Sequence, residues 1–140
     1  FPNLKFGSVE AGIGWVPWAL QAMDEAYIKH HWAVRPKLDL LPSEYFKRQG
    51  FATFQEDAAG LDLAISHDLV ANFMWANDYP HHEGSWPHSA EAIERTMGEL
   101  DDANRARILG LNAAEVFGIP IPERYLDHDD AQQCARRVAS

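Results

Sequence analysis

Three apolar segments, each followed by sequence with helical periodicity, limit this chain to a small number of folds. The segments cover residues 4–9, 51–55 and 69–76, and their composition is typical of strands. The third, "LVANFMWA", is apolar on both faces except for Asn72, which is typical of a central parallel strand covered by helices on both sides. Repeated strand–helix alternation predicts an α/β fold with a parallel sheet, its strands near residues 4–9, 51–55 and 70–76.

The intervening segments are expected to be helical. A helix is expected to begin near Ala58, and Ser89 and Asp101 are the expected N-caps of two later helices. Gly118 is expected to end the last helix, so residues 1–118 form the folded part and residues 119–140 an irregular tail. In the first helix, apolar residues recur at the spacing of a single buried stripe: Val16, Leu20, Met23, Tyr27 and Ile28.

Composition excludes several classes of function. The formal net charge is -9, and the chain has no Lys/Arg cluster, which argues against binding to nucleic acid. No apolar run reaches the roughly 18 to 20 residues of a membrane span. The single cysteine, Cys134, excludes an intramolecular disulfide framework and a cysteine-based zinc site. A cytoplasmic location is therefore expected.

An acidic residue follows the end of each predicted strand. These residues are Glu10, the pair Glu56–Asp57, and Asp78. Taken singly, such a carboxylate commonly caps a loop or a helix. Because the carboxyl ends of parallel strands meet at one edge, the three positions together predict a single acidic pocket. Asp78 follows a rigid buried strand and is the best placed to bind a metal or to accept a proton.

Histidines behind Asp78 add nitrogen ligands to this carboxylate-rich edge, which suits a divalent metal. His81 and His82 are adjacent, so they point in different directions and cannot both easily bind one metal. His88 precedes the expected N-cap, and a loop hydrogen bond is as good an interpretation as a ligand role. Neither a phosphate-binding glycine loop nor a G-x-S-x-G nucleophile motif occurs in the sequence.

Four segments resemble the metal-dependent amidohydrolases, and they occur in the family's order. The most specific is "MWANDYPHHEGSWPHS", which is similar to the M-W-[AG]-S-D-Y-P-H segment on the last barrel strand. The resemblance is to the amidohydrolase-2 branch, which includes aminocarboxymuconate-semialdehyde and resorcylate decarboxylases, and it covers residues 1–119. The other three segments are "FPNLKFGSVEAGIGWVP", "LPSEYFKRQGFATFQED" and "RILGLNAAEVFGI".

The resemblance implies a TIM (β/α)8 barrel of which this chain supplies only the last three βα units. Such barrels need about 250 residues, so the N-terminal half of the barrel would be the missing partner. The first residue is Phe rather than Met, which fits either a fragment or the removal of an N-terminal part. The rival architecture is a three-layer sandwich complete in itself. Open parallel edges associate readily, so a homo-oligomer is also expected.

The resemblance also implies roles for individual residues. Of the family's metal ligands, only the aspartate after the eighth strand carries over, onto Asp78, with zinc or manganese as the expected metal. Where members often place a catalytic histidine after the sixth strand, this sequence has Glu10. The side chains expected to contact substrate come from the same loops: Trp15, Asp57, His81 and His88.

The expected activity is that of a metal-dependent hydrolase or non-oxidative decarboxylase acting on a small carboxylated or cyclic substrate. This chain alone is expected to be inactive, because the upstream metal-binding strands are missing. The alternative is a non-catalytic half-barrel that serves as a scaffold or interaction module. If the second strand lies between the other two, the carboxylates of Glu10 and Asp78 are expected on the order of 10 Å apart.

Overall fold

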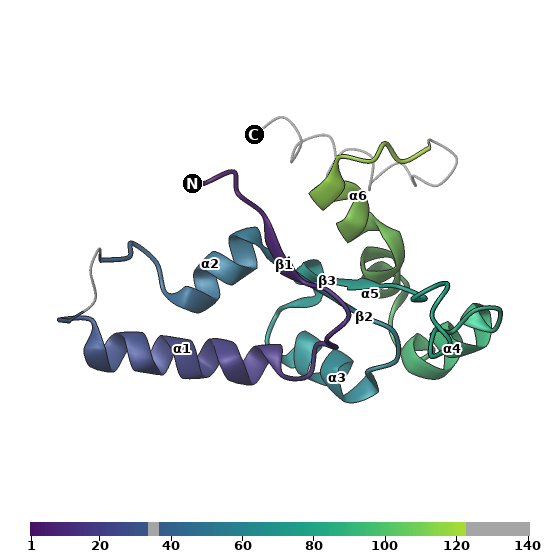
Figure 1. Ribbon diagram of the computed structural model, residues 1–140, viewed down its shortest axis with the longest axis horizontal. Helices are drawn as coiled ribbons and strands as arrows, with labels where there is room; N and C mark the ends of the chain where they lie inside the picture. The colour runs from purple at the N-terminus through teal and green to yellow at the C-terminus, as the bar shows by residue number, and fades with distance from the viewer. Residues whose placement is uncertain (34–36, 123–140) are drawn as a thin grey trace.

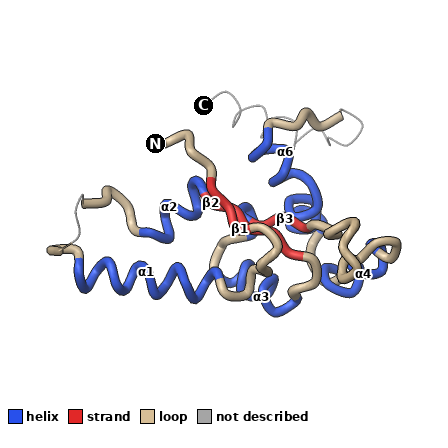
Figure 2. The backbone as a smooth tube through the Cα atoms, viewed as in Figure 1, coloured by secondary structure: helices blue, strands red, loops and turns tan. Residues whose placement is uncertain are grey.

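A three-stranded parallel sheet lies at the centre of the computed structural model, which describes residues 1–33 and 37–122. The strands, drawn in red in Figure 2, pair in the order β1-β2-β3. Ser8 lies opposite Ala52, and Ala52 lies opposite Phe73. An α/β fold with a parallel sheet is confirmed. The strands are β1 (Phe6–Ser8), β2 (Gly50–Phe54) and β3 (Phe73–Trp75).

Six α-helices are described around this sheet. A 3₁₀ turn precedes β3, and one π-helical segment, Arg107–Leu111, joins the last two helices. Figure 1 shows α1 and α2 at one end of the molecule and α4, α5 and α6 at the other, with the sheet and α3 between them. Within the described ranges, no helix has both the length and the apolarity to cross a membrane. The helices are α1 (Val16–His30), α2 (Pro42–Gln49), α3 (Ala58–Ser66), α4 (Ser89–Met97), α5 (Asp102–Ala106) and α6 (Asn112–Phe117).

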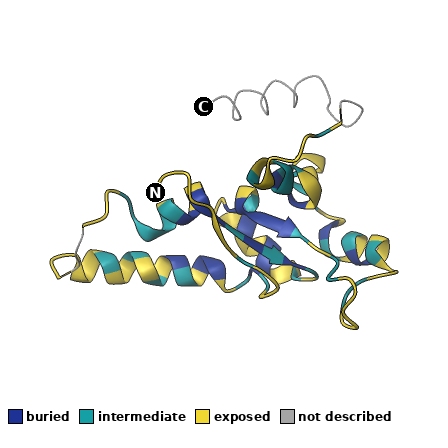
Figure 3. Cartoon of the chain, turned by 45° about the horizontal axis from the view of Figure 1, so that its top comes forward, coloured by how far each residue is buried: buried dark blue, intermediate teal, exposed yellow. Residues whose placement is uncertain are grey.

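The core lies against one face of the central strand β2. Ala52 and Phe54 are buried, whereas Phe51 and Thr53, on the opposite face, are only half-buried. Dark blue residues therefore gather at the sheet and at the end of α1 nearest to it (Figure 3). The core cluster contains Ile13, Val16, Leu20, Phe46, Ala52, Phe54, Leu61, Ala64, Leu69, Phe73, Met97 and Ile108.

Asn72, the polar residue in the third apolar segment, is a structural residue. Its side chain is buried, and its amide nitrogen lies 2.8 Å from the carbonyl oxygen of Gly50 and 3.1 Å from that of Phe46. Buried polar groups are stabilised only when they are hydrogen-bonded. Asn72 therefore joins the start of β3 to the α2–β2 junction.

Two predictions about packing are wrong. β3 is buried on adjacent residues, Phe73 and Met74, as expected, but it lies at an edge of the described sheet, and β2 is the central strand. The predicted buried stripe of α1 ends early: Met23 is 52% exposed and Ile28 is 59% exposed. The reason is geometric, because α1 extends beyond the sheet and its far end lies in solvent (Figure 3).

The predicted helix ends are confirmed except the one at Ser89. Helix α3 begins at Ala58 and Gly118 ends α6 in the left-handed conformation with a φ of 65°, as predicted. Ser89, however, is the first residue of α4, and His88 occupies the N-cap position. The Ser89 hydroxyl lies 3.2 Å from the Ser85 hydroxyl and does not cap the helix. The predicted irregular tail lies, from residue 123 onward, outside the described residues.

Asp101 caps α5 as predicted, and this cap gives a pH-dependent expectation. Its carboxylate accepts the backbone N–H of Asn104 at 3.0 Å, and mainly for this reason the pKa of Asp101 lies below its ordinary value. A carboxyl group with a lowered folded-state pKa stabilises the fold above its unfolded pKa and loses that contribution as pH falls through its folded pKa.

We therefore expect the melting temperature of the wild type to fall, relative to that of an Asp101→Asn variant, as pH is lowered from above the unfolded-state pKa of Asp101 to below its folded-state pKa. The asparagine remains a competent, uncharged cap at every pH. Thermal unfolding of both proteins across an acid series measures the difference. A difference that does not change with pH would contradict this role of Asp101.

Candidate functional site

The side chains of Glu10, Asp78 and His81 meet at the carboxyl ends of the strands. His81 Nδ1 lies 2.8 Å from Asp78 Oδ1 and 3.3 Å from Glu10 Oε1. One potential ligand atom from each residue lies within 4.8 Å of the other two. The loop after β1 and the loop after β3 thus contribute to one cluster, although β2 separates their strands.

Asp78 occupies the most constrained position of the three. Its backbone has a φ of 56°, in the left-handed region that few residues other than Gly, Asn and Asp adopt readily. Its side chain is only 13% exposed, and its Oδ2 atom is buried without a hydrogen-bond partner among the described residues. A buried carboxylate oxygen without a partner is costly unless a cation or a donor completes it.

His81 is held at the base of a compact loop. Its backbone N–H donates to the carbonyl of Asp78 at 2.9 Å, and its own carbonyl accepts from Gly84 at 3.0 Å. The pKa of His81 is raised above its ordinary value, first by the hydrogen bond to the Asp78 carboxylate and then by the charges of Asp78 and Glu10. The two carboxylates thus stabilise the protonated imidazole.

The expected separation of about 10 Å between the carboxylates of Glu10 and Asp78, which was derived from two strand spacings, is wrong. Both residues have left-handed backbones, with φ values of 66° and 56°, and both side chains approach the same imidazole nitrogen across the end of β2. Strand spacing fixes where the backbones leave the sheet, but it does not fix how far the side chains then converge.

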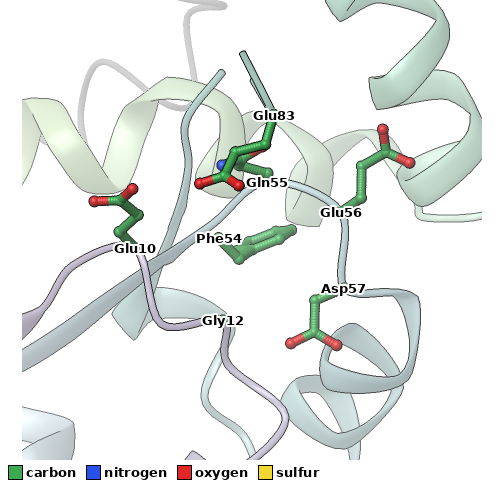
Figure 4. Close-up of a pocket in the computed structure, with 7 residues that line it drawn as sticks. All are labelled: Glu10, Gly12, Phe54, Gln55, Glu56, Asp57 and Glu83. Carbon is green, nitrogen blue, oxygen red and sulfur yellow. The ribbon is translucent and has the colours of Figure 1, made fainter. Parts of the chain in front are cut away.

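The predicted acidic pocket exists in part. A shallow cavity of about 340 Å³ lies beside the cluster, with carboxylates around Phe54 (Figure 4). Asp78 does not line it, and Glu56 forms an ion pair with Arg95, whose Nη2 atom lies 2.6 Å from Glu56 Oε1. The lining residues are Glu10, Gly12, Phe54, Gln55, Glu56, Asp57 and Glu83.

The other candidate residues lie outside the cluster. Asp57 caps α3 and uses both carboxylate oxygens on backbone N–H groups, which argues against a substrate contact through them. Trp15 is 46% exposed, and its indole N–H donates to the carbonyl of Gly12 at 3.2 Å. The His88 side chain is 78% exposed and lies 3.8 Å from the Glu91 carboxylate. Substrate contacts by Trp15 and His88 stay predictions.

A family model described as Amidohydrolase matches residues 1–119. The chain belongs to the amidohydrolase family. Of the solved structures, 5-carboxyvanillate decarboxylase LigW from Sphingomonas paucimobilis is 30% identical, with a TM-score of 0.69 over 86% of this chain and 35% of that one. The comparison with curated proteins found no match.

Two further solved structures are similar in fold. A dihydroxybenzoic acid decarboxylase from Polaromonas sp. JS666, with bound manganese and 2-nitroresorcinol, is 22% identical with a TM-score of 0.62 and is matched over 91% of this chain and 37% of that one. A 2,6-dihydroxybenzoate decarboxylase complexed with 2,6-dihydroxybenzoate is 20% identical, with a TM-score of 0.65. It is matched over 84% of this chain and 36% of that one. The amidohydrolase chain thus spans about a third of the length of these relatives.

The donor set of this amidohydrolase fits a divalent metal. Carboxylate oxygens and an imidazole nitrogen are the ligands that zinc and manganese accept, and the three ligand atoms lie within 4.8 Å of one another. The same Asp78 carboxylate that meets His81 through Oδ1 leaves its buried Oδ2 atom without a partner among the described residues. A bound cation would satisfy it.

Proposed function

We propose that this chain forms the last three βα units of a (β/α)8 barrel in a metal-dependent carboxy-lyase or hydrolase. Residues 1–118 would form the barrel units, and the remaining strands would supply further metal ligands. The observation that carries the proposal is the buried Asp78 Oδ2 atom at the carboxyl end of β3, beside Glu10 and His81, which has no hydrogen-bond partner within residues 1–33 and 37–122. In barrel enzymes this rim is where the chemistry occurs.

Asp78 would bind the metal through Oδ2 and hold the His81 ring through Oδ1. The metal, when bound, would supply a positive charge that orients an acidic substrate and polarises its oxygen atoms. Glu10 would assist by holding the same His81 nitrogen from the opposite side. Fixed in this way, His81 directs Nε2 away from both carboxylates, where it can exchange a proton with a bound molecule.

The proposed substrate is a small carboxylated ring compound. The support is the 30% identity to a 5-carboxyvanillate decarboxylase over 86% of this chain. Decarboxylation is therefore favoured over hydrolysis, and the metal is proposed to be zinc or manganese. A cytoplasmic location stays a prediction.

Carbon dioxide release from 5-carboxyvanillate and 2,6-dihydroxybenzoate, measured on the complete barrel before and after chelation, tests this function. We expect release that stops on chelation and returns with Mn²⁺ or Zn²⁺. Release that survives complete removal of metal would overturn the proposal. A complete barrel that binds metal but converts neither these acids nor cyclic amides would favour the alternative, a non-catalytic scaffold.

The exposed edges of the sheet give a further expectation, about association. β1 lies at one edge with Phe6 46% exposed, and Val9 just beyond it is 66% exposed. Unpaired strand edges bind other strands. We expect this chain alone to self-associate in multi-angle light scattering, and to become a defined species when the remainder of the barrel is supplied. A stable monomer at all concentrations would argue for a sandwich complete in itself.

A further inference from the structure

We propose that Thr53 and Asp57, two side chains of the β2 strand and its loop, are positioning residues for the candidate site. They hold residues 10–14, the Glu10 loop, in the conformation that keeps the Glu10 carboxylate against His81. This inference rests on the proposed function for its consequence. The geometry that it describes can be tested separately.

Thr53 holds the start of the Glu10 loop. Its hydroxyl accepts the backbone N–H of Glu10 at 2.9 Å. Glu10 has a φ of 66°, and a glutamate in this left-handed conformation is strained unless neighbouring contacts impose it. The hydrogen bond from β2 supplies such a contact at the residue whose side chain belongs to the cluster.

Asp57 holds the other end of the loop. Its Oδ2 atom accepts the backbone N–H groups of Ile13 and Gly14, both at 2.8 Å, while Oδ1 accepts that of Gly60 at 2.8 Å. A carboxylate that accepts three backbone N–H groups forms charge-assisted bonds, which are stronger than neutral ones. Asp57 thus ties the loop after β1 to the first turn of α3.

The packing around Asp57 leaves little freedom for a different arrangement. A Cβ atom added to Gly60 would lie 2.5 Å from Asp57 Oδ2 and 2.6 Å from an Ile13 side-chain carbon. Gly12, which has a φ of 66°, would place a Cβ atom 3.2 Å from the same oxygen. The glycines therefore allow the loop and α3 to approach one carboxylate closely.

The contact between Glu10 and His81 links the Glu10 loop to the proposed metal site. The separation of 3.3 Å between Glu10 Oε1 and His81 Nδ1 joins two loops whose strands are not neighbours. If the Glu10 loop relaxes, this contact opens and His81 loses one of the two carboxylates that hold its ring against the metal-binding Asp78. Residues that orient metal ligands typically change metal affinity by about 10- to 100-fold when they are replaced.

Two substitutions with matched controls test the inference. Thr53→Val keeps the branched shape and removes the acceptor, whereas Thr53→Ser keeps the hydroxyl. Asp57→Asn leaves one side-chain oxygen for three N–H groups, whereas Asp101→Asn changes the N-cap of α5, far along the chain, in the same way. The readouts are the Glu10–His81 separation in crystal structures and the Mn²⁺ affinity of each protein by calorimetry.

In the Thr53→Val and Asp57→Asn proteins we expect the separation to increase beyond hydrogen-bonding distance and Mn²⁺ affinity to fall by about 10-fold or more. Thr53→Ser and Asp101→Asn should have the same Glu10–His81 separation and the same Mn²⁺ affinity as the wild type. An unchanged separation, or a changed one with unchanged Mn²⁺ affinity, would overturn the inference. A wild type that binds no Mn²⁺ would refute the proposed metal site instead, and the crystallographic separation would still decide whether Thr53 and Asp57 hold Glu10.

Discussion

An Asp78→Asn substitution in the complete barrel is expected to abolish metal-dependent turnover while leaving the fold intact. Asparagine adopts the left-handed conformation found at position 78, where φ is 56°, so the backbone should keep its conformation. The substitution removes the charge that the metal or the proton needs. Because replacing a residue that only supports a ligand already costs up to about 100-fold in affinity, losing the ligand itself should cost at least that much.

Asp68 provides a matched control for this experiment. It has the same left-handed backbone, with a φ of 55°, and its side chain is 98% exposed, 3.5 Å from Lys47. Asp68→Asn should therefore leave turnover and metal content unchanged. Normal turnover in the Asp78→Asn enzyme would end the case for this site. The corresponding Glu10→Gln enzyme should be milder if Glu10 only orients His81, and equally impaired if Glu10 transfers the proton itself.

A Phe73→Ala substitution is expected to have the largest effect on stability. Phe73 is fully buried in β3 and belongs to the core cluster. Removing a buried phenylalanine ring costs about 3–5 kcal/mol, because its apolar surface is lost and a cavity remains. Since whole domains are stable by only about 5–15 kcal/mol, this change should remove a large fraction of the free energy of unfolding.

Phe117→Ala is the matched control, because the same ring is removed from a residue that is 61% exposed. Phe117 makes one edge-to-face contact with Phe51, at 5.8 Å between ring centroids, so we expect a loss of about 1 kcal/mol or less. Urea denaturation of both variants measures the free energy of unfolding. Equal losses would show that β3 is not part of the core.

The sequence predicted the parallel α/β sheet, because strand–helix alternation has few solutions. It did not predict which strand would be central, since the apolar run 69–76 is buried on adjacent residues at an edge. It also predicted too long a buried stripe for α1. Periodicity reports which residues could face a core, and how far the sheet extends beneath the helix decides which residues do.

The candidate site was predictable at Asp78 and less so around it. The strand ends indicated Glu10 and Asp57 as well, but they could not distinguish a carboxylate that meets His81 from one that caps α3. For Asp57, its position directly before the predicted helix start at Ala58 was the available signal of a cap. For Thr53 no sequence signal existed, because its partner Glu10 is distant in the chain.

Paramagnetic broadening by Mn²⁺ of the NMR spectrum of this chain, supplied with the remainder of the barrel, tests the proposed metal centre most directly. At substoichiometric Mn²⁺, we expect the amide signals of Glu10, Asp78 and His81 to broaden first, because their ligand atoms lie within 4.8 Å of one another. The same signals should stay sharp in the Asp78→Asn variant. Broadening that begins at another acidic segment, such as Asp101–Asp102, or that persists unchanged in the variant, would contradict the proposed site.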